Sequence, residues 1–95
     1  MDRSEALKLV EDELKKQSPD LDCAVLDDET IEKSWGWVFF YQSKAFISSG
    51  DFRDMLGGNA PFIVNRTNGE IYVTGTAYEI EHYIKEYEAN LQSNT

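Results

Sequence analysis

The stretch that most constrains the fold is WGWVFFYQS, residues 35–43. Alternate residues of a β-strand point to opposite faces of a sheet. In this stretch both faces would be bulky and apolar, with Trp35, Trp37, Phe39 and Tyr41 on one and Val38 and Phe40 on the other. A strand that is apolar on both faces is usually central and covered on both sides. The sequence therefore predicts a central strand over residues 35–43.

A hairpin is predicted further along the chain. Phe62–Val64 and Ile71–Val73 are short apolar runs rich in β-branched and aromatic residues,. Asn68-Gly69, in the loop between them, suits a tight turn that needs a positive φ. The segment should therefore form two antiparallel strands with Gly69 at the tip. The Gly57–Asn59 stretch before Pro61 predicts a turn that leads into this hairpin.

Two amphipathic helices are predicted near the ends of the chain. Asp2 is a plausible N-cap for a helix over residues 3–17, with Glu5 at the third helical position,. Thr76 with Glu79 forms a similar capping-box pattern, which predicts a second helix over residues 77–91,. The apolar stripes of these helices are Ala6, Leu7, Val10 and Leu14 in the first, and Ile80, Tyr83, Ile84, Tyr87 and Leu91 in the second,.

The first strand of the chain completes the set of elements from which the fold class is predicted. Leu21–Leu26 predicts the first strand, and Thr30–Glu32 could continue it after a bulge or turn,. Strands joined by short turns form an antiparallel sheet, and two amphipathic helices are expected to cover only one of its faces. We therefore expect a single domain over residues 1–95 of the α+β class. It would have a four-stranded antiparallel sheet, with the N-terminal and C-terminal helices packed on one face.

That arrangement leaves the second face of the sheet to be explained. In one assignment this face holds Trp35, Trp37 and Tyr72, an aromatic patch that a monomer rarely leaves open, so loops or a partner would cover it. In the other assignment the Trp face lies inside, because Trp side chains often fill a small core. The sequence favours neither assignment.

The charge of the chain restricts its partners. Asp and Glu number 18 against 9 Lys and Arg, which gives a formal net charge of −9. This charge argues against binding nucleic acid or anionic membranes. It permits a basic protein partner, although acidic surfaces also serve simply to keep small proteins soluble. The single cysteine, Cys23, and a polar N-terminus with no apolar stretch of a signal peptide favour the cytoplasm,.

Residues that could carry chemistry are few. His82 is the only histidine and Cys23 the only cysteine, so the chain cannot complete a zinc site,. A nucleophile pair of Cys23 and His82, oriented by Asn59, can be drawn, but nothing in the local sequence supports it,. The acidic run Asp27–Glu29 lacks the spaced ligands and the glycine of a calcium loop. Gly57–Ala60 lacks the lysine of a phosphate-binding loop. We therefore expect a protein that is not an enzyme, with no catalytic, cofactor or metal site.

Three pieces of sequence occur in a fixed order along the chain. They are Trp35–Tyr41, then Gly58–Pro61 with the apolar strand after it, and then Thr67–Glu70 leading to Gly75–Ala77 and Tyr83-Ile84. Although no single piece is specific, the ordered set resembles the immunity protein 35 family, also called the YrhB-type domain, over nearly the whole chain. The chain departs from that family in one turn, where the usual Thr-Gly is Thr67-Asn68-Gly69.

The resemblance implies a small bacterial α+β protein of the cytoplasm, without catalytic residues. Such proteins are similar to the immunity proteins of polymorphic toxin systems, which bind a cognate toxin domain and neutralise it by occlusion. Some relatives resemble free-standing proteins, so the alternative is a chaperone-like or structural binding protein that uses an exposed aromatic sheet face. The residues that carry the resemblance are strand aromatics, turn glycines and a helix cap, and they do not mark the toxin-binding surface.

The partner-binding residues are predicted from charge and aromatic content. An acidic rim would meet a basic cleft of the toxin, and exposed aromatic side chains would act as anchors. We expect a basic protein toxin as partner, no nucleic acid and no membrane, and the sequence leaves a homodimer open. The residues are Asp27, Asp28, Glu29 and Glu32 for the rim, and Trp35, Trp37 and Tyr72 for the anchors.

Overall fold

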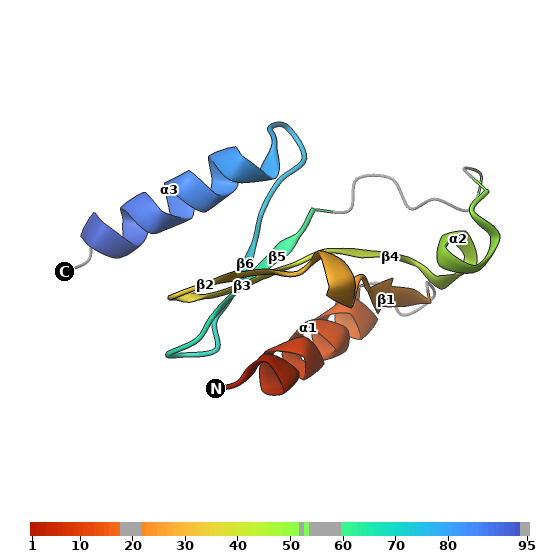
Figure 1. The fold of residues 1–95 in the computed structure, drawn as a ribbon, viewed down its shortest axis with the longest axis horizontal. Helices are drawn as coiled ribbons and strands as arrows, with labels where there is room; N and C mark the ends of the chain where they lie inside the picture. The colour runs from red at the N-terminus through yellow and green to blue at the C-terminus, as the bar shows by residue number, and fades with distance from the viewer. Residues whose placement is uncertain (18–21, 52, 54–59, 94–95) are drawn as a thin grey trace.

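A computed structural model describes residues 1–17, 22–51, 53 and 60–93 of the chain (Figure 1). The strands form a four-stranded antiparallel sheet of order β2-β3-β5-β6 and a two-stranded sheet of β1 and β4. This confirms the α+β class with a helix near each end. The elements are α1 (Arg3–Gln17), β1 (Cys23–Val25), the 3-10 helix η1 (Asp27–Glu29), β2 (Ile31–Lys33), β3 (Gly36–Phe39), β4 (Tyr41–Ser43), α2 (Lys44–Ser49), β5 (Phe62–Asn65), β6 (Ile71–Val73) and α3 (Ile80–Ser93).

The centre of the fold is the pair of strands β3 and β5. Every residue of both strands is buried. Strand β3 lies between β2 and β5, as a strand that is apolar on both faces should,. The register sets Trp37 opposite Val64 and Val38 opposite Ile63. The prediction of a central, doubly covered strand is therefore confirmed.

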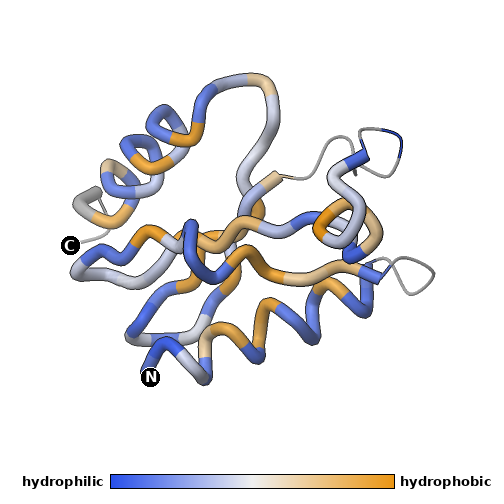
Figure 2. Tube along the Cα trace, turned by 45° about the vertical axis from the view of Figure 1, so that its right-hand side comes forward, coloured by the Kyte–Doolittle hydropathy of each residue, from blue (hydrophilic) through white to orange (hydrophobic). Residues whose placement is uncertain are grey.

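The two long helices cover opposite faces of the four-stranded sheet, as Figure 1 shows. One core cluster joins Ala6, Val10 and Leu14 of α1 to the face that carries Trp37. A second cluster joins Ile84 of α3 to Val38 and Ile63 on the other face. Figure 2 shows apolar residues along the strands and on the sides of α1 and α3 that face them. The expectation that both helices pack on one face is wrong, because each apolar face of β3 needs its own cover.

The structure covers both faces of β3, so the choice between the two predicted assignments does not arise. The face that carries Trp37 lies inside, as in the second assignment, and the register places Val64 opposite Trp37, so their side chains share the face covered by α1,. Trp35 belongs to the hairpin turn between β2 and β3 and packs on the α3 side. The open aromatic patch of the first assignment is therefore absent among the described residues.

The predicted strand over residues 35–43 is divided at Phe40. Strand β3 ends at Phe39, and Tyr41–Ser43 forms β4, which pairs with β1 in the second sheet. The carbonyl oxygen of Phe40 accepts a hydrogen bond from the backbone N–H of Leu26 at 2.8 Å. The Tyr41 ring stacks on that of Phe62 with centroids 5.2 Å apart, so the core continues past the break.

The two predicted helix caps have different outcomes. At α1 the carboxylate of Asp2 accepts from the N–H of Glu5 at 2.9 Å, and the carboxylate of Glu5 accepts from the N–H of Asp2 at 3.2 Å. That capping box is confirmed. The one at Thr76 is wrong, because α3 begins only at Ile80. In its place, the Tyr83 hydroxyl accepts hydrogen bonds from the N–H groups of Ala77 (3.1 Å) and Tyr78 (3.3 Å).

The predicted hairpin is confirmed. Strands β5 and β6 pair antiparallel, and Gly69 in their loop has a φ of 72°, in the left-handed region that favours glycine,. The side chain of Asn65 accepts from the N–H of Thr67 at 2.8 Å, which fixes the start of the loop. The turn predicted at Gly57–Asn59 lies outside the described residues.

The Tyr83 hydroxyl should contribute measurably to the stability of the fold. Tyr83→Phe removes the acceptor for two backbone N–H groups, and we expect it to lower the free energy of unfolding by about 1 kcal/mol,. Urea denaturation monitored by circular dichroism measures the change. Tyr78→Phe is the matched control, because the Tyr78 side chain is 64% exposed. Equal midpoints for the two variants would contradict this role.

A side chain at Gly36 should disrupt the central strand pair. A Cβ atom there would lie 1.9 Å from the carbonyl oxygen of Val64, so β3 and β5 would have to separate. We expect Gly36→Ala to cost about 3 kcal/mol or more of unfolding free energy. A Cβ atom at Gly69 would lie 3.0 Å from the flexible end of the Met1 side chain and 3.6 Å from Leu9 Cδ1, so Gly69→Ala should cost about 1 kcal/mol, mainly for its positive φ,. If the Gly36→Ala protein is as stable as the Gly69→Ala protein, β3 does not approach the Val64 carbonyl oxygen as closely as described.

Candidate functional site

A groove with an acidic rim lies between the two-stranded sheet, η1 and α2. Its volume is about 880 Å³. Among the described residues, its lining contains three carboxylates and no Lys or Arg, together with several apolar side chains. We call it the acidic groove, and its lining residues are Ala24, Val25, Leu26, Asp27, Asp28, Glu29, Gln42, Phe46, Ile47 and Gly50.

The acidic side of this groove is held in place by η1. The N–H of Glu29 donates to the carbonyl oxygen of Leu26 at 2.9 Å, and the N–H of Thr30 donates to that of Asp27 at 3.2 Å. These bonds form one tight turn, and Asp27, Asp28 and Glu29 are all exposed on it,. The turn therefore presents three neighbouring carboxylates to solvent.

One of these carboxylates already has a cation beside it. The Arg3 guanidinium donates to the Asp27 carboxylate at 3.0 Å and to the Asp27 carbonyl oxygen at 2.8 Å. This contact ties η1 to the start of α1. Within the described part of the chain, no ion pair involves Asp28 or Glu29. Their charges are therefore available to an approaching molecule.

The apolar side of the groove comes from α2, which the sequence analysis did not predict. The hydroxyl of Ser43 accepts from the N–H of Phe46 at 3.1 Å and caps the helix, and Gly50 ends it in the left-handed region,. Ile47 stands on this short helix with its side chain 48% exposed. Ser43 followed by a short apolar run was the one signal that could have revealed α2.

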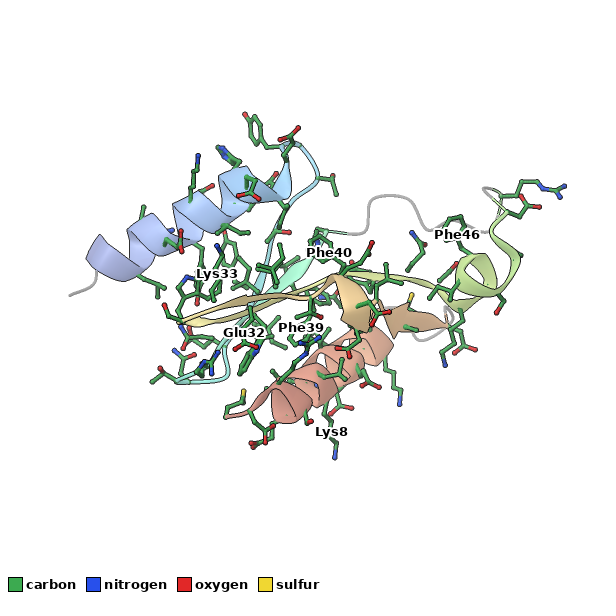
Figure 3. All side chains as sticks on the ribbon, in the orientation of Figure 1. Lys8, Glu32, Lys33, Phe39, Phe40 and Phe46 are labelled. Atoms are coloured by element: carbon green, nitrogen blue, oxygen red, sulfur yellow. The ribbon has the colours of Figure 1, made fainter. Side chains whose placement is uncertain are left out.

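Glu32 does not line the acidic groove. Figure 3 shows Glu32 on β2 and Phe46 on α2, well separated along the long axis of the molecule. The Glu32 carboxylate pairs with the Arg66 guanidinium at 3.4 Å, and that guanidinium lies 4.5 Å from the centroid of the Trp37 ring. Arg66 thus links Glu32 to the core face covered by α1. The structure therefore separates Glu32 from the other predicted rim residues.

The predicted aromatic anchors are not equivalent. Trp37 is 1% exposed, so the expectation that it is an exposed anchor is wrong. Trp35 is half-buried, and its indole N–H donates to Glu88 of α3 at 3.0 Å. Tyr72 is 37% exposed, and Tyr87 of α3 contacts both Trp35 and Tyr72, with ring centroids 4.8 and 5.6 Å away. Trp35 and Tyr72 therefore form a small cluster beneath α3, apart from the acidic groove.

A smaller cleft of about 330 Å³ adjoins the acidic groove and is lined in part by Cys23, Asp22 and Lys44. Burial, followed by the negative charge of Asp22, raises the pKa of the Cys23 thiol,. The thiol is therefore protonated at neutral pH, which does not suit a nucleophile. The structure does not bring Cys23 to His82, because Cys23 packs with the α1 cluster and His82 stands on α3 against the ring of Tyr78, 4.3 Å away.

A metal site and a membrane-spanning helix are both absent from the residues that the structure describes. Among them, no three or more His, Cys, Asp or Glu side chains gather in a way that could hold a metal ion. In the same residues, no helix combines the length and the apolar character needed to span a bilayer.

Comparison with known proteins identifies the family of the chain. The sequence pattern described as immunity protein 35 matches residues 4–87. The chain is also similar to YrhB of Escherichia coli (strain K12), which is described as uncharacterized, with 44% identity over 55 residues. That match covers 58% of this chain and 58% of YrhB. No solved structure matches the chain significantly. Because the family pattern spans almost all of the sequence, the chain belongs to the immunity protein 35 family.

Proposed function

We propose that this protein is an immunity protein that binds a cognate toxin domain through the acidic groove and neutralises it by occlusion. The observation that carries the proposal is the groove itself, whose described lining has three carboxylates, no cation and an apolar wall. Membership of the immunity protein 35 family supports a protein toxin as the partner. In this proposal the protein acts by binding alone, in the bacterial cytoplasm, and catalyses no reaction.

The chemistry of the groove specifies the partner. Carboxylates at the rim attract a basic surface over long distances and accelerate encounter. The exposed Ile47 side chain and the neighbouring Phe46 offer apolar area that can be buried on contact,. A basic toxin surface with a projecting apolar side chain would satisfy both requirements. Placing that surface in the groove would block a toxin whose active-site cleft is basic.

The alternative, a chaperone-like or structural protein that uses an exposed aromatic sheet face, loses its main support. Trp37 and Phe39 are buried beneath α1, with exposures of 1% and 0%. Trp35 is held by Glu88 of α3. Little of the predicted aromatic face is therefore available to hold apolar segments of other proteins.

Reversing the charge of the rim should slow association with the toxin. The variant Asp27→Lys, Asp28→Lys, Glu29→Lys changes an exposed turn that contributes no residue to either core cluster, so the fold should persist. We expect its association rate constant to fall roughly tenfold or more at low salt, because electrostatic steering is lost. The measurement is surface plasmon resonance with the partner recovered from the native host, in low and high salt.

A matched control variant distinguishes the effect of the rim charges from the effect of the overall net charge. Glu79→Lys, Glu81→Lys, Glu86→Lys alters the charge by the same amount at three exposed positions on or next to α3. Association of this control should slow much less than that of the rim variant. Rates that are independent of salt and of the rim reversal, or equally slow for both variants, would contradict binding at the acidic groove.

A further inference from the structure

The outer edge of β6 is a second surface, and it shares no residue with the acidic groove. Strand β6 is the last in the order β2-β3-β5-β6, and among the described residues it pairs only with β5. Two backbone hydrogen bonds flank that pairing. The N–H of Thr74 donates to the carbonyl oxygen of Pro61 at 3.1 Å, and the N–H of Asn65 donates to the carbonyl oxygen of Glu70 at 3.0 Å.

These flanking bonds determine which backbone groups point outward. In an antiparallel pair, the residues that exchange hydrogen bonds alternate along the strand. Because Thr74 and Glu70 bond toward β5, Tyr72 between them also bonds toward β5. The N–H and C=O groups of Ile71 and Val73 then face away from the sheet. The edge therefore offers two donors and two acceptors in the spacing that another strand requires.

The two edges of the sheet differ in how they are protected. Edge strands are usually kept from pairing with other chains by charged side chains, prolines or bulges. Strand β2 follows this rule, since it carries Glu32 and Lys33. Strand β6 reads Ile71-Tyr72-Val73 and carries no charge, and Val73 is 47% exposed. The β6 edge is thus open to pairing in a way that the β2 edge is not.

The charge around β6 selects the occupant. Between Arg66, which pairs with Glu32, and Lys85, the segment contains the carboxylates Glu70, Glu79 and Glu81 and no further Lys or Arg. A second copy of the chain would bring its own net charge of −9 to this edge and would be repelled,. A strand that carries Lys or Arg would be attracted. We propose that the outer edge of β6 binds an extended basic segment of a partner protein as an added strand.

The added strand would be recognised in two ways. Its backbone would bond to the outward groups of Ile71 and Val73, which supplies affinity for any extended chain. Its side chains would alternate between the two faces, beside Val73 on one and Tyr72 on the other, where apolar residues fit. Basic residues would lie near Glu70 at one end of the strand. This surface is independent of the acidic groove, so it can hold a segment whether or not the groove binds a toxin.

A synthetic peptide tests the edge directly. The probe is a fluorescent Lys-Val-Lys-Val-Lys-Val peptide titrated with the full chain in low salt, with binding read by fluorescence anisotropy. Its matched control carries N-methyl groups on alternate residues, which keeps the charge but removes the N–H donors along one edge. We expect the unmodified peptide to bind roughly tenfold or more tightly than the control, because strand pairing needs those donors.

Two protein variants locate the binding. Val73→Lys places a cation on the β6 edge, and Ala45→Lys makes the same change of charge at an exposed position of α2 that does not line the acidic groove. We expect Val73→Lys to weaken peptide binding roughly tenfold or more, and Ala45→Lys to leave it nearly unchanged. Both changes are at exposed positions, and thermal unfolding monitors the folding of each variant.

The proposal has clear contrary outcomes. Absence of peptide binding, equal binding of the N-methylated peptide, or equal effects of the two variants would overturn it. Self-association of the chain that strengthens with salt in sedimentation velocity and is abolished by Val73→Lys would assign the edge to a second copy instead. Because the peptide assay needs no toxin, its failure is distinguishable from failure of binding at the acidic groove.

Discussion

The pairing of β3 with β5, buried on both faces, is the constraint on which the rest of the structure depends. Each face of this pair is apolar, with Trp37 and Val64 on one and Val38 and Ile63 on the other. In a chain this small, one helix supplies cover for one face only, so α1 and α3 are both needed,. The helices at opposite ends of the sequence are therefore joined through the strands between them, and loss of either would expose a core face.

This use of the sheet determines where function can reside. Aromatic side chains that look like binding anchors in the sequence are taken up by the core, as Trp37 is, or held by α3, as Trp35 is. The parts of the described structure that remain available are its margins: the acidic groove beside β1 and α2, and the outer edge of β6. Both carry negative charge nearby, in keeping with the net charge of −9.

Local features of the fold were predictable from the sequence, and non-local ones were not. The Asp2–Glu5 capping box, the positive φ of Gly69 and the burial of β3 each depend on a few neighbouring residues. The face shared by Trp37 and Val64 depends on the register of strands far apart in sequence,. At the late start of α3, the Tyr83 hydroxyl accepts from the N–H of Tyr78, one of the groups that a helix cap at Thr76 would have accepted, and this contact spans residues that a local pattern does not connect,. The acidic run at Asp27–Glu29 was visible in the sequence, but the apolar wall beside it comes from α2, a helix too short for a periodic pattern,.

The central functional claim is that a toxin partner occupies the acidic groove. Amide hydrogen exchange, measured by mass spectrometry for the free chain and for its complex with a partner from the native host, tests this most directly. We expect slower exchange in residues 24–29 and 44–50, which line or support the groove, because bound protein excludes water there,. Unchanged exchange in both segments, with slowing confined to α3 or to other parts of the chain, would contradict it.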